Sequence, residues 1–398
     1  MISGMLTGLI VNLYVDNPLI RDTVLMNNVF YFGGEIFIRL MKMLVVPLVF
    51  SSIVVSLVSI SNMRKLGKIG RSAMIFYILL TVIALIIAFG VTSIIKPGIG
   101  INLASSGQAA NMATNLTMTE TILNIIPENP ISALTNGEML PIILFGMLIG
   151  YIIMKLKDEI HVADNIFKEL NDIIIIMTET LMKFAPVGVF CMMARTFGTM
   201  GFESIFSLAK LIGCVAIGTG ILVFIIYPIM IFIFTRSNPL RFFKKYFQVM
   251  LFAFSSTSSN ATIPLNIDTL EDIGISRDIS SFTIPLGTTF SQNGAAIIFG
   301  TGVLFAAQCH GIDLTASALL TLTLIILPNT ISTPPVPMAG IFSLTIIFQT
   351  AGLPLAAADM MMGIYNILDM FVTLCNVTGN GICTTITASL HRSHDNPD

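Results

Sequence analysis

A run of small hydroxyl-bearing residues, 255–259, interrupts the apolar carboxy-terminal third of this chain. Backbone groups left unpaired at membrane depth are costly unless they line a protein cavity. A helix that begins at this run would offer unpaired N–H groups and hydroxyls, which suit the carboxylate of a ligand. Pro264 and the long apolar flanks argue against the other interpretation, a solvated loop.

One acid stands alone in the last apolar stretch. Asp369 is the only charged residue between Met360 and Leu390. An ionisable residue within a membrane span marks a functional site by default, although it can also be a structural hydrogen-bonding acid. Its carboxylate could accept hydrogen bonds from an ammonium group. Together with the serine run, Asp369 therefore predicts a minimal receptor for a zwitterionic amino acid.

Two further breaks interrupt neighbouring apolar stretches. Residues 330–337 include three prolines within four positions, which cannot continue a helix. The uncharged stretch 279–308 is broken around residues 291–294. The carboxy-terminal half is thus predicted to contain a hairpin near 241–275, a broken helix, a second hairpin near 313–352 and an amphiphilic last helix. Inverted repeats with discontinuous helices are typical of secondary transporters.

The composition predicts a multi-pass membrane protein. The chain is 55% hydrophobic and 11% charged, whereas soluble proteins carry about 25% charged residues. Residues 72–95 and 211–235 are uncharged, and each stretch is long enough to cross about 30 Å of hydrocarbon as a helix. A net charge of −2 without a basic pattern argues against a nucleic-acid partner. The five cysteines lack metal-ligand spacing and are predicted to be buried free thiols.

Basic residues predict the orientation, because cytoplasmic loops are enriched in Lys and Arg. The clusters that agree with one another are Arg64, Lys65, Lys68 and Arg71, then Lys155 and Lys157, then Arg236, Arg241, Lys244 and Lys245. They predict an integral protein of a bacterial-type inner membrane with both termini cytoplasmic. Residues 1–15 lack the basic start and cleavage site of a signal peptide and are short for a span. They predict a first helix without its beginning.

These motifs resemble the dicarboxylate/amino acid:cation symporter family, which includes glutamate transporters and neutral amino acid exchangers. The resemblance covers residues 5–390 and rests on segments 42–47, 258–264, 281–287, 353–354, 369–370 and 376–379. It implies an all-α membrane protein with about eight transmembrane helices, two re-entrant helical hairpins, inverted repeats and an elevator mechanism. It also implies a homotrimer, with scaffold and trimerisation helices mainly in 1–70 and 96–236 and a transport domain mainly in 71–95 and 237–398.

The resemblance further implies a substrate site. Its residues in this sequence are Thr257, Ser258, Ser259, Ala295, Val336, Asp369, Val372, Thr373 and Asn376. Members with acidic substrates place an arginine in the last helix or at the first hairpin tip, where this chain has Val372 and Thr257. Because a buried carboxylate without a partner is very costly, we predict a substrate whose side chain is neutral rather than acidic.

Cation sites follow from the same resemblance. Their residues here are Gly287, Thr289, Ser291, Gln292, Asn293, Thr330, Ile331, Thr333, Asn376 and Asn380. Two positions that are acidic in relatives hold the amides Asn293 and Asn380. Hard cations prefer oxygen ligands, and anionic oxygens bind them most strongly. Sodium is therefore the expected coupling ion, bound more weakly than in relatives, and neither a further metal nor a cofactor is predicted.

The sequence thus predicts a secondary active transporter of small amino acids or related carboxylates, with membrane lipid as its surroundings. A proton-coupled or uncoupled amino acid exchanger and a dicarboxylate symporter remain open alternatives. An ion channel would show a continuous polar stripe in several helices, whereas polarity here is concentrated in one unit. An intramembrane enzyme would need a metal or nucleophile cluster, yet the four histidines flank the apolar stretches.

Overall fold

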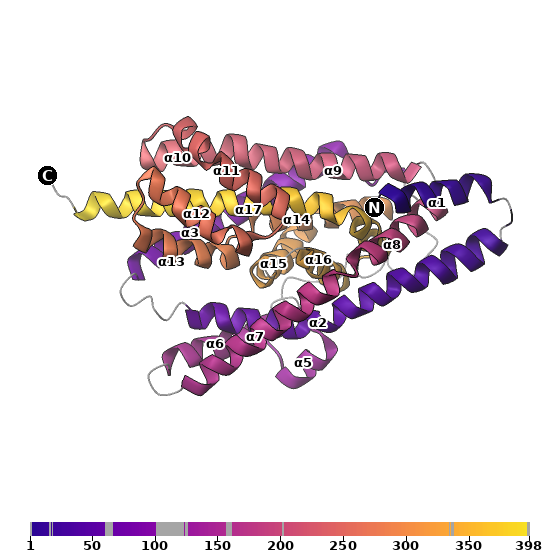
Figure 1. The fold of residues 1–398 in the computed structure, drawn as a ribbon, viewed down its shortest axis with the longest axis horizontal. Helices are drawn as coiled ribbons and strands as arrows, with labels where there is room; N and C mark the ends of the chain where they lie inside the picture. The colour runs from indigo at the N-terminus through magenta and orange to yellow at the C-terminus, as the bar shows by residue number, and fades with distance from the viewer. Residues whose placement is uncertain are drawn as a thin grey trace.

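The computed structural model describes residues 2–15, 17, 19–59, 67–100, 123, 126–156, 161–200, 203–333, 335 and 338–395. These parts of the chain are helical and contain no strand, which confirms the predicted all-α class (Figure 1). Arg64, Lys65 and Lys157 of the predicted cytoplasmic clusters lie outside the described residues, as does Val336 of the predicted substrate site.

The first half of the chain supplies the peripheral helices. In order they are α1 (Ile2–Tyr14), η1 (Leu19–Phe30), α2 (Tyr31–Ser59), α3 (Gly67–Ile95), α5 (Pro130–Asn136), α6 (Met139–Lys155), α7 (His161–Met182), α8 (Ala185–Met200), α9 (Glu203–Ile221), η4 (Leu222–Ile226) and α10 (Tyr227–Thr235). In Figure 1, α2, α6 and α7 lie on one side of the bundle and α9–α11 on the other.

The second half supplies the centre. Its helices are α11 (Pro239–Ser256), α12 (Ser259–Ile273), α13 (Arg277–Phe290), α14 (Asn293–Cys309), α15 (Ala316–Ser332), α16 (Ala339–Thr350) and α17 (Ala356–Asp395). Nearly every residue of α14 is buried, and this helix packs against α3 and α17. The long helix α17 runs through the middle of the bundle (Figure 1) and contacts both halves of the chain.

Four segments within the described residues are long and apolar enough to cross a membrane: Lys68–Ile95, Phe206–Thr235, Arg277–Cys309 and Ala356–His391. Their burial differs sharply. The most apolar window of Arg277–Cys309 is 94% buried, whereas that of Lys68–Ile95 is 39% buried. Since exposed side chains such as Ile75 and Ile86 are large and apolar, the outer helices present a surface suited to lipid. All five cysteines are buried and free, as predicted.

The first helix pair, α11 and α12, turns at the predicted serine run. Thr257 ends α11 in the left-handed region, with φ of 51°. Ser258 caps α12, because its Oγ accepts a hydrogen bond of 3.3 Å from the N–H of Ala261. Gly274, with φ of 101°, ends α12 where few other residues could. Local chemistry thus determines where α11 ends and where α12 begins and ends.

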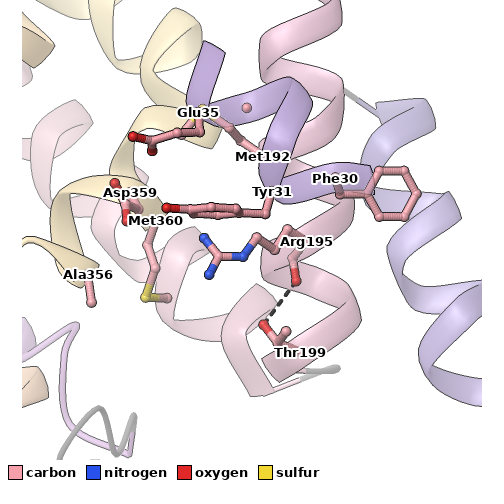
Figure 2. A pocket seen from close by; sticks show the side chains of 10 residues that line it. Phe30, Tyr31, Glu35, Met192, Arg195, Thr199, Ala356, Asp359 and Met360 are labelled. Carbon is pink, nitrogen blue, oxygen red and sulfur yellow. Dashed lines mark hydrogen bonds between the residues drawn. The ribbon is translucent and has the colours of Figure 1, made fainter. Parts of the chain in front are cut away.

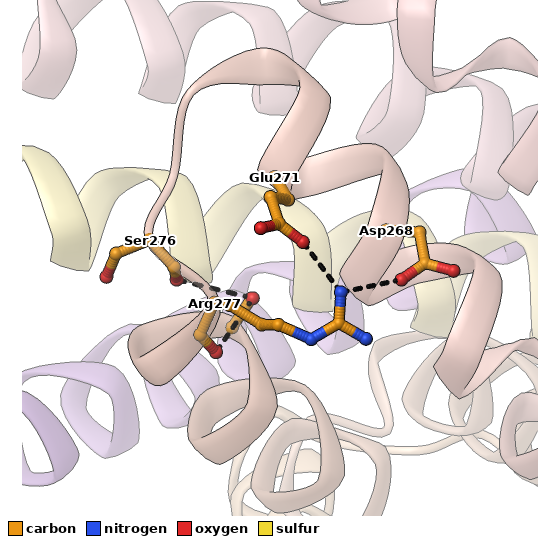
Figure 3. Close-up of polar contacts among 5 residues, drawn as sticks. Asp268, Glu271, Ser276 and Arg277 are labelled. Atoms are coloured by element: carbon orange, nitrogen blue, oxygen red, sulfur yellow. Dashed lines mark hydrogen bonds and ion pairs between the residues drawn. The ribbon is translucent and has the colours of Figure 1, made fainter.

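Charged contacts hold the far end of the first pair. Figure 3 shows the Arg277 guanidinium between two carboxylates of α12, 2.7 Å from Glu271 and 3.1 Å from Asp268. The Lys245 ammonium donates to the carbonyl of Asp272 at 2.7 Å. All of these side chains are exposed, so each ion pair contributes about 0–1 kcal/mol.

The second pair, α15 and α16, lies where the second hairpin was predicted. Thr315 caps α15 through a hydrogen bond from the N–H of Ala318, and Met338 precedes α16 in the left-handed region with φ of 62°. Between α13 and α14 the helix is interrupted at Ser291 and Gln292. The three breaks are therefore where the sequence predicts them; whether the pairs re-enter a membrane stays a prediction.

Candidate substrate cavity and neighbouring amide cluster

Three interruptions and the middle of α17 surround one small cavity. It has a volume of about 20 Å³ and is lined by Thr257, Ser259, Gln292, Ala295, Thr333, Pro335, Gly340, Tyr365, Asp369, Val372, Thr373 and Asn376. Most of the predicted substrate residues are therefore brought together. The exceptions are Ser258, whose side chain caps α12 instead, and Val336, which the structure does not describe.

The cavity has room for about one water molecule and is much smaller than any amino acid. A ligand of that size requires the surrounding elements to separate. One described hydrogen bond holds the start of α16 to α17 at the cavity. Its donor is the N–H of Met338, which donates to Asp369 Oδ2 at 2.9 Å.

Asp369 carries the negative charge of the cavity. The residue is only 6% exposed, and Met338 is the hydrogen-bond donor described for its carboxylate. The ion pairs of the described residues do not include it. A carboxylate in this state has acceptor capacity left for a ligand, and burial makes a cationic donor the most favourable one.

The tip of the first pair contributes donors. Ser259 is the first residue of α12, is buried, and lines the cavity. The first N–H groups of a helix have no intrahelical acceptor. The N-terminus of α12 therefore brings partial positive charge to the cavity, at the side where Thr257 and Ser259 lie. An anionic group of a ligand would be stabilised there.

An amide network joins α17 to the break between α13 and α14. Asn376 Oδ1 accepts from the N–H of Gly294 at 2.7 Å, and Asn376 Nδ2 donates to Gln292 Oε1. Gln292 Nε2 donates to the carbonyl of Thr288 at 2.9 Å and lies 3.5 Å from that of Thr333. The network fixes the geometry of the break between α13 and α14 and extends to Thr333 at the end of α15.

Asn293 is bonded to the protein through both ends of its amide. Its Nδ2 donates to the Tyr227 hydroxyl at 3.0 Å, and its Oδ1 accepts from Thr81 Oγ1 at 3.0 Å. The Tyr227 hydroxyl in turn donates to the carbonyl of Cys375 at 3.0 Å. This predicted cation ligand therefore also holds α3, α10 and α17 to the start of α14.

Asn380, in contrast to Asn293, has an amide without described hydrogen-bond partners. It is 1% exposed, and neither its Oδ1 nor its Nδ2 has a hydrogen-bond partner among the described residues. Ser291 Oγ is likewise buried without a described partner. A Cβ placed on Gly287 would lie 2.9 Å from Asn380 Oδ1, and the N–H of Ser291 donates to the Gly287 carbonyl at 2.7 Å. Three predicted cation-site residues thus lie together.

This group can offer oxygens to a cation. Buried polar atoms without a partner are rare in native proteins and call for a ligand, an ion or a water as explanation. Uncharged oxygens at a helix break are the ligands that coordinate sodium in secondary transporters. In the described part of the chain no group of three or more His, Cys, Asp or Glu is placed to hold a metal. The donor set therefore suits a monovalent cation.

The other predicted cation-site residues, Thr289, Gln292, Thr330, Ile331 and Thr333, are only partly assembled. Thr333 reaches Gln292 through its carbonyl, as described above, and Thr330 is fully buried with its hydroxyl donating to Leu327 at 2.7 Å. Thr289 and Ile331 are partly buried. The contacts described here join Thr333 and Gln292 and do not bring the other three into one site.

A larger cavity of about 170 Å³ lies elsewhere, among α2, α8 and the start of α17. In Figure 2 the Arg195 guanidinium lies under the ring of Tyr31, the carboxylate of Glu35 lies on the other side of that ring, and Asp359 lies beside its hydroxyl end. The guanidinium carbon is 4.7 Å from the ring centroid. Glu35 is paired with Arg39 at 2.8 Å, as the spacing of these two residues predicts.

Sequence reasoning missed three tyrosines of the site region. Tyr77 lies beside Gly287 and Asn380, Tyr227 bonds Asn293, and Tyr365 lines the cavity. Tyr77 and Tyr227 could not be found, because their partners are remote in sequence. Tyr365 could have been found, since it precedes Asp369 by four residues and so shares its helix face.

Comparisons with known proteins identify the family of this chain. A family model described as the sodium:dicarboxylate symporter family matches residues 1–390. A proton/sodium-glutamate symport protein of Geobacillus stearothermophilus is 31% identical over 361 residues, covering 89% of this chain and 86% of that protein. A proton/glutamate-aspartate symporter of Escherichia coli is 29% identical, covering 99% and 92%. A C4-dicarboxylate transport protein of Paraburkholderia phymatum is 28% identical, covering 91% and 87%.

Proposed function

The chain belongs to the sodium:dicarboxylate symporter family, and we propose that it is a sodium-coupled symporter for a small amino acid or related carboxylate with an uncharged side chain. Membership makes it an integral membrane transport protein with a small-molecule substrate rather than an enzyme. The substrate class, the coupling ion and the assembly are the parts that we propose.

The substrate class rests on one observation: none of the described residues that line the cavity is a cation. Val372 lies there, one helical turn from Asp369. A second carboxylate would be buried beside Asp369 without a positive partner, which is very costly. The relatives are named for glutamate, aspartate and C4-dicarboxylates, so an acidic substrate is the rival that the experiment must exclude.

Binding would use the charges already described. The substrate ammonium would pair with Asp369, and the substrate carboxylate would lie at the N-terminus of α12 near Ser259. Entry would separate α16 from α17 and break the bond between Met338 and Asp369. An ammonium that takes the place of this N–H would link occupancy of the cavity to the position of the second helix pair.

Sodium would bind beside Asn380, Ser291 and Gly287. These groups offer neutral oxygens only, so the site gains less electrostatic energy from the ion than one containing a carboxylate. The proposal is therefore a sodium site of reduced affinity. A proton-coupled symporter and an uncoupled exchanger remain the alternatives for the coupling step.

We extend the proposal to the assembly. The helices of 1–70 and 96–236 would form the scaffold of a homotrimer, and 71–95 with 237–398 would form an elevator-type transport domain. In its support, α3 packs against α14 and α17, whereas α1 and α2 pack against α6, α7 and α8. Both helix pairs would re-enter the membrane, and both termini would be cytoplasmic in the inner membrane, since Lys68, Arg71 and Arg236 are basic residues at the same predicted side.

The deciding experiment is uptake into liposomes that contain the purified protein. With an inward sodium gradient, unlabelled serine, alanine or threonine should inhibit uptake of labelled serine at lower concentrations than glutamate, aspartate or succinate. If an acidic compound is the tightest competitor, the proposed substrate class is wrong. Replacing external sodium with choline, with and without a proton gradient, separates sodium coupling from proton coupling and from uncoupled exchange.

A further inference from the structure

Four tyrosines of the described residues are completely buried, and three of them have hydrogen-bond partners. The Tyr77 hydroxyl donates to the carbonyl of Thr283 at 2.8 Å, and that of Tyr227 to the carbonyl of Cys375 at 3.0 Å. The Tyr246 hydroxyl lies 2.8 Å from Asn266 Oδ1 and 2.9 Å from the carbonyl of Val377. The Tyr365 hydroxyl has no partner among the described residues.

Tyr365 differs from the other three tyrosines in its position at the cavity. Of the four, Tyr365 is the one that lines it. Buried tyrosine hydroxyls usually find a partner, because an unsatisfied one keeps the full cost of its lost hydration. Tyr365 therefore holds an unused donor and acceptor next to the space that the substrate is proposed to occupy.

The hydroxyl also touches the element that must move. A Cβ added to Gly340, in the first turn of α16, would overlap the Tyr365 oxygen. When α16 moves to admit a ligand, as proposed above, this contact opens together with the Met338 bond to Asp369. Tyr365 and Asp369 are four residues apart and so lie on one face of α17, about one turn from each other.

We propose that the Tyr365 hydroxyl binds a hydroxyl or amide group on the substrate's side chain, so that the transporter selects serine- or threonine-like amino acids over alanine- or valine-like ones. This inference rests on the proposed function. A tyrosine hydroxyl both donates and accepts, which matches an alcohol or an amide. A site that hydrogen-bonds a substrate group rejects the analogue that lacks it, because its own polar atom is then left unpaired.

Shape-matched pairs of amino acids test this. Threonine and valine have nearly the same shape, as do serine and alanine. In competition with labelled serine, the wild type should bind serine at least about 10-fold more tightly than alanine, and threonine at least about 10-fold more tightly than valine. In Tyr365→Phe the hydroxylated members should weaken while alanine and valine do not, so that both ratios approach one.

Tyr246→Phe is the matched control, because it removes the same oxygen from a buried tyrosine that has protein partners. It should lower thermal stability and leave the serine-to-alanine ratio unchanged. Equal affinity for serine and alanine in the wild type would overturn the inference but leave the proposed neutral substrate intact. An equal loss for both in Tyr365→Phe would also overturn it, since packing alone would explain that result. Preference for glutamate would instead overturn the proposed function itself.

Discussion

Two of the cavities among the described residues differ in size and in the hydrogen bonding of the polar groups near them. The outer one, between α2, α8 and α17, is about 170 Å³ and is lined by Arg195, Glu35 and Asp359. The inner one is about 20 Å³ and has Asp369 as the charged group of its lining. Size and number of charges would select the outer cavity as the binding site.

The bonding of their polar groups points to the inner cavity instead. In the outer cavity Glu35 is paired with Arg39, and Arg195 lies against Tyr31, with part of each side chain exposed. The Tyr365 hydroxyl, in the lining of the inner cavity, has no partner among the described residues, and neither have the buried polar atoms of Ser291 and Asn380 in the neighbouring cluster. A buried unsatisfied group costs about 1–3 kcal/mol, whereas an exposed one is hydrated. The comparison teaches that the proposal of the inner cavity rests on unmet hydrogen-bonding capacity and not on volume.

Replacing the inner acid should have the largest effect. Asp369→Asn keeps the shape and removes the charge that is proposed to hold the substrate ammonium. Truncating one partner of a buried charge pair costs about 2–5 kcal/mol, so serine uptake into liposomes should fall about 30-fold or more. Size-exclusion chromatography in detergent should show an unchanged assembly.

Asp359→Asn is the matched control, since it makes the same change on the same helix in the outer cavity. It should reduce uptake much less than Asp369→Asn does. The reverse order of the two variants would show that the wrong cavity has been chosen.

Adding a cation to the inner cavity should change its selectivity. Val372→Arg places a guanidinium where a second carboxylate could bind it bidentately. Glutamate should then compete with labelled substrate about 10-fold better than in the wild type, which corresponds to about 1.4 kcal/mol. Serine should compete less well, because the larger side chain takes space from a very small cavity. Val372→Leu adds bulk without charge, and improved glutamate binding by this control would remove the electrostatic explanation.

Restoring a charge to the amide cluster should strengthen sodium binding. Asn380→Asp gives the ion an anionic ligand, and a gain of about 1.4 kcal/mol would lower the sodium concentration for half-maximal uptake about 10-fold. Asn366→Asp is the control, because Asn366 is exposed on the same helix. A sodium dependence that is equal in the wild type and in Asn380→Asp would show that no sodium is bound at Asn380.

The sequence predicts the breaks of the fold well because their causes are local. Hydroxyl-bearing residues cap α12, and prolines prevent α15 from continuing into α16. The lone acid Asp369 is visible for the same reason, since its neighbours in the chain are uncharged. Local composition therefore predicts the helix breaks of the second half and the acid at the centre of the candidate site.

The remainder of the site depends on contacts between distant residues. Asn293 bonds Thr81 across 212 positions and Tyr227 across 66, so its structural role could not be read from its neighbours. That Tyr365 lacks a partner is likewise a property of the packed structure, which no local pattern records. The sequence identifies which residue types could bind a ligand; the fold determines which of them are already bonded to the protein.

The smallest effect is expected in the outer cavity. Arg195→Gln removes a guanidinium that lies 4.7 Å from the Tyr31 ring centroid, a contact worth about 0.5–1 kcal/mol where solvent reaches it. A loss of this size shifts the melting temperature by only about 1 °C in a chain of 398 residues, because the entropy of unfolding grows with chain length. Serine uptake and its half-saturating concentration should stay within about 2-fold of the wild type, since the variant changes no group of the inner cavity. Glu35→Gln, which instead releases Arg39, should behave in the same way. Loss of uptake in both variants at unchanged melting temperature would mean that the outer cavity takes part in transport, and the contrast between the two cavities would then no longer hold.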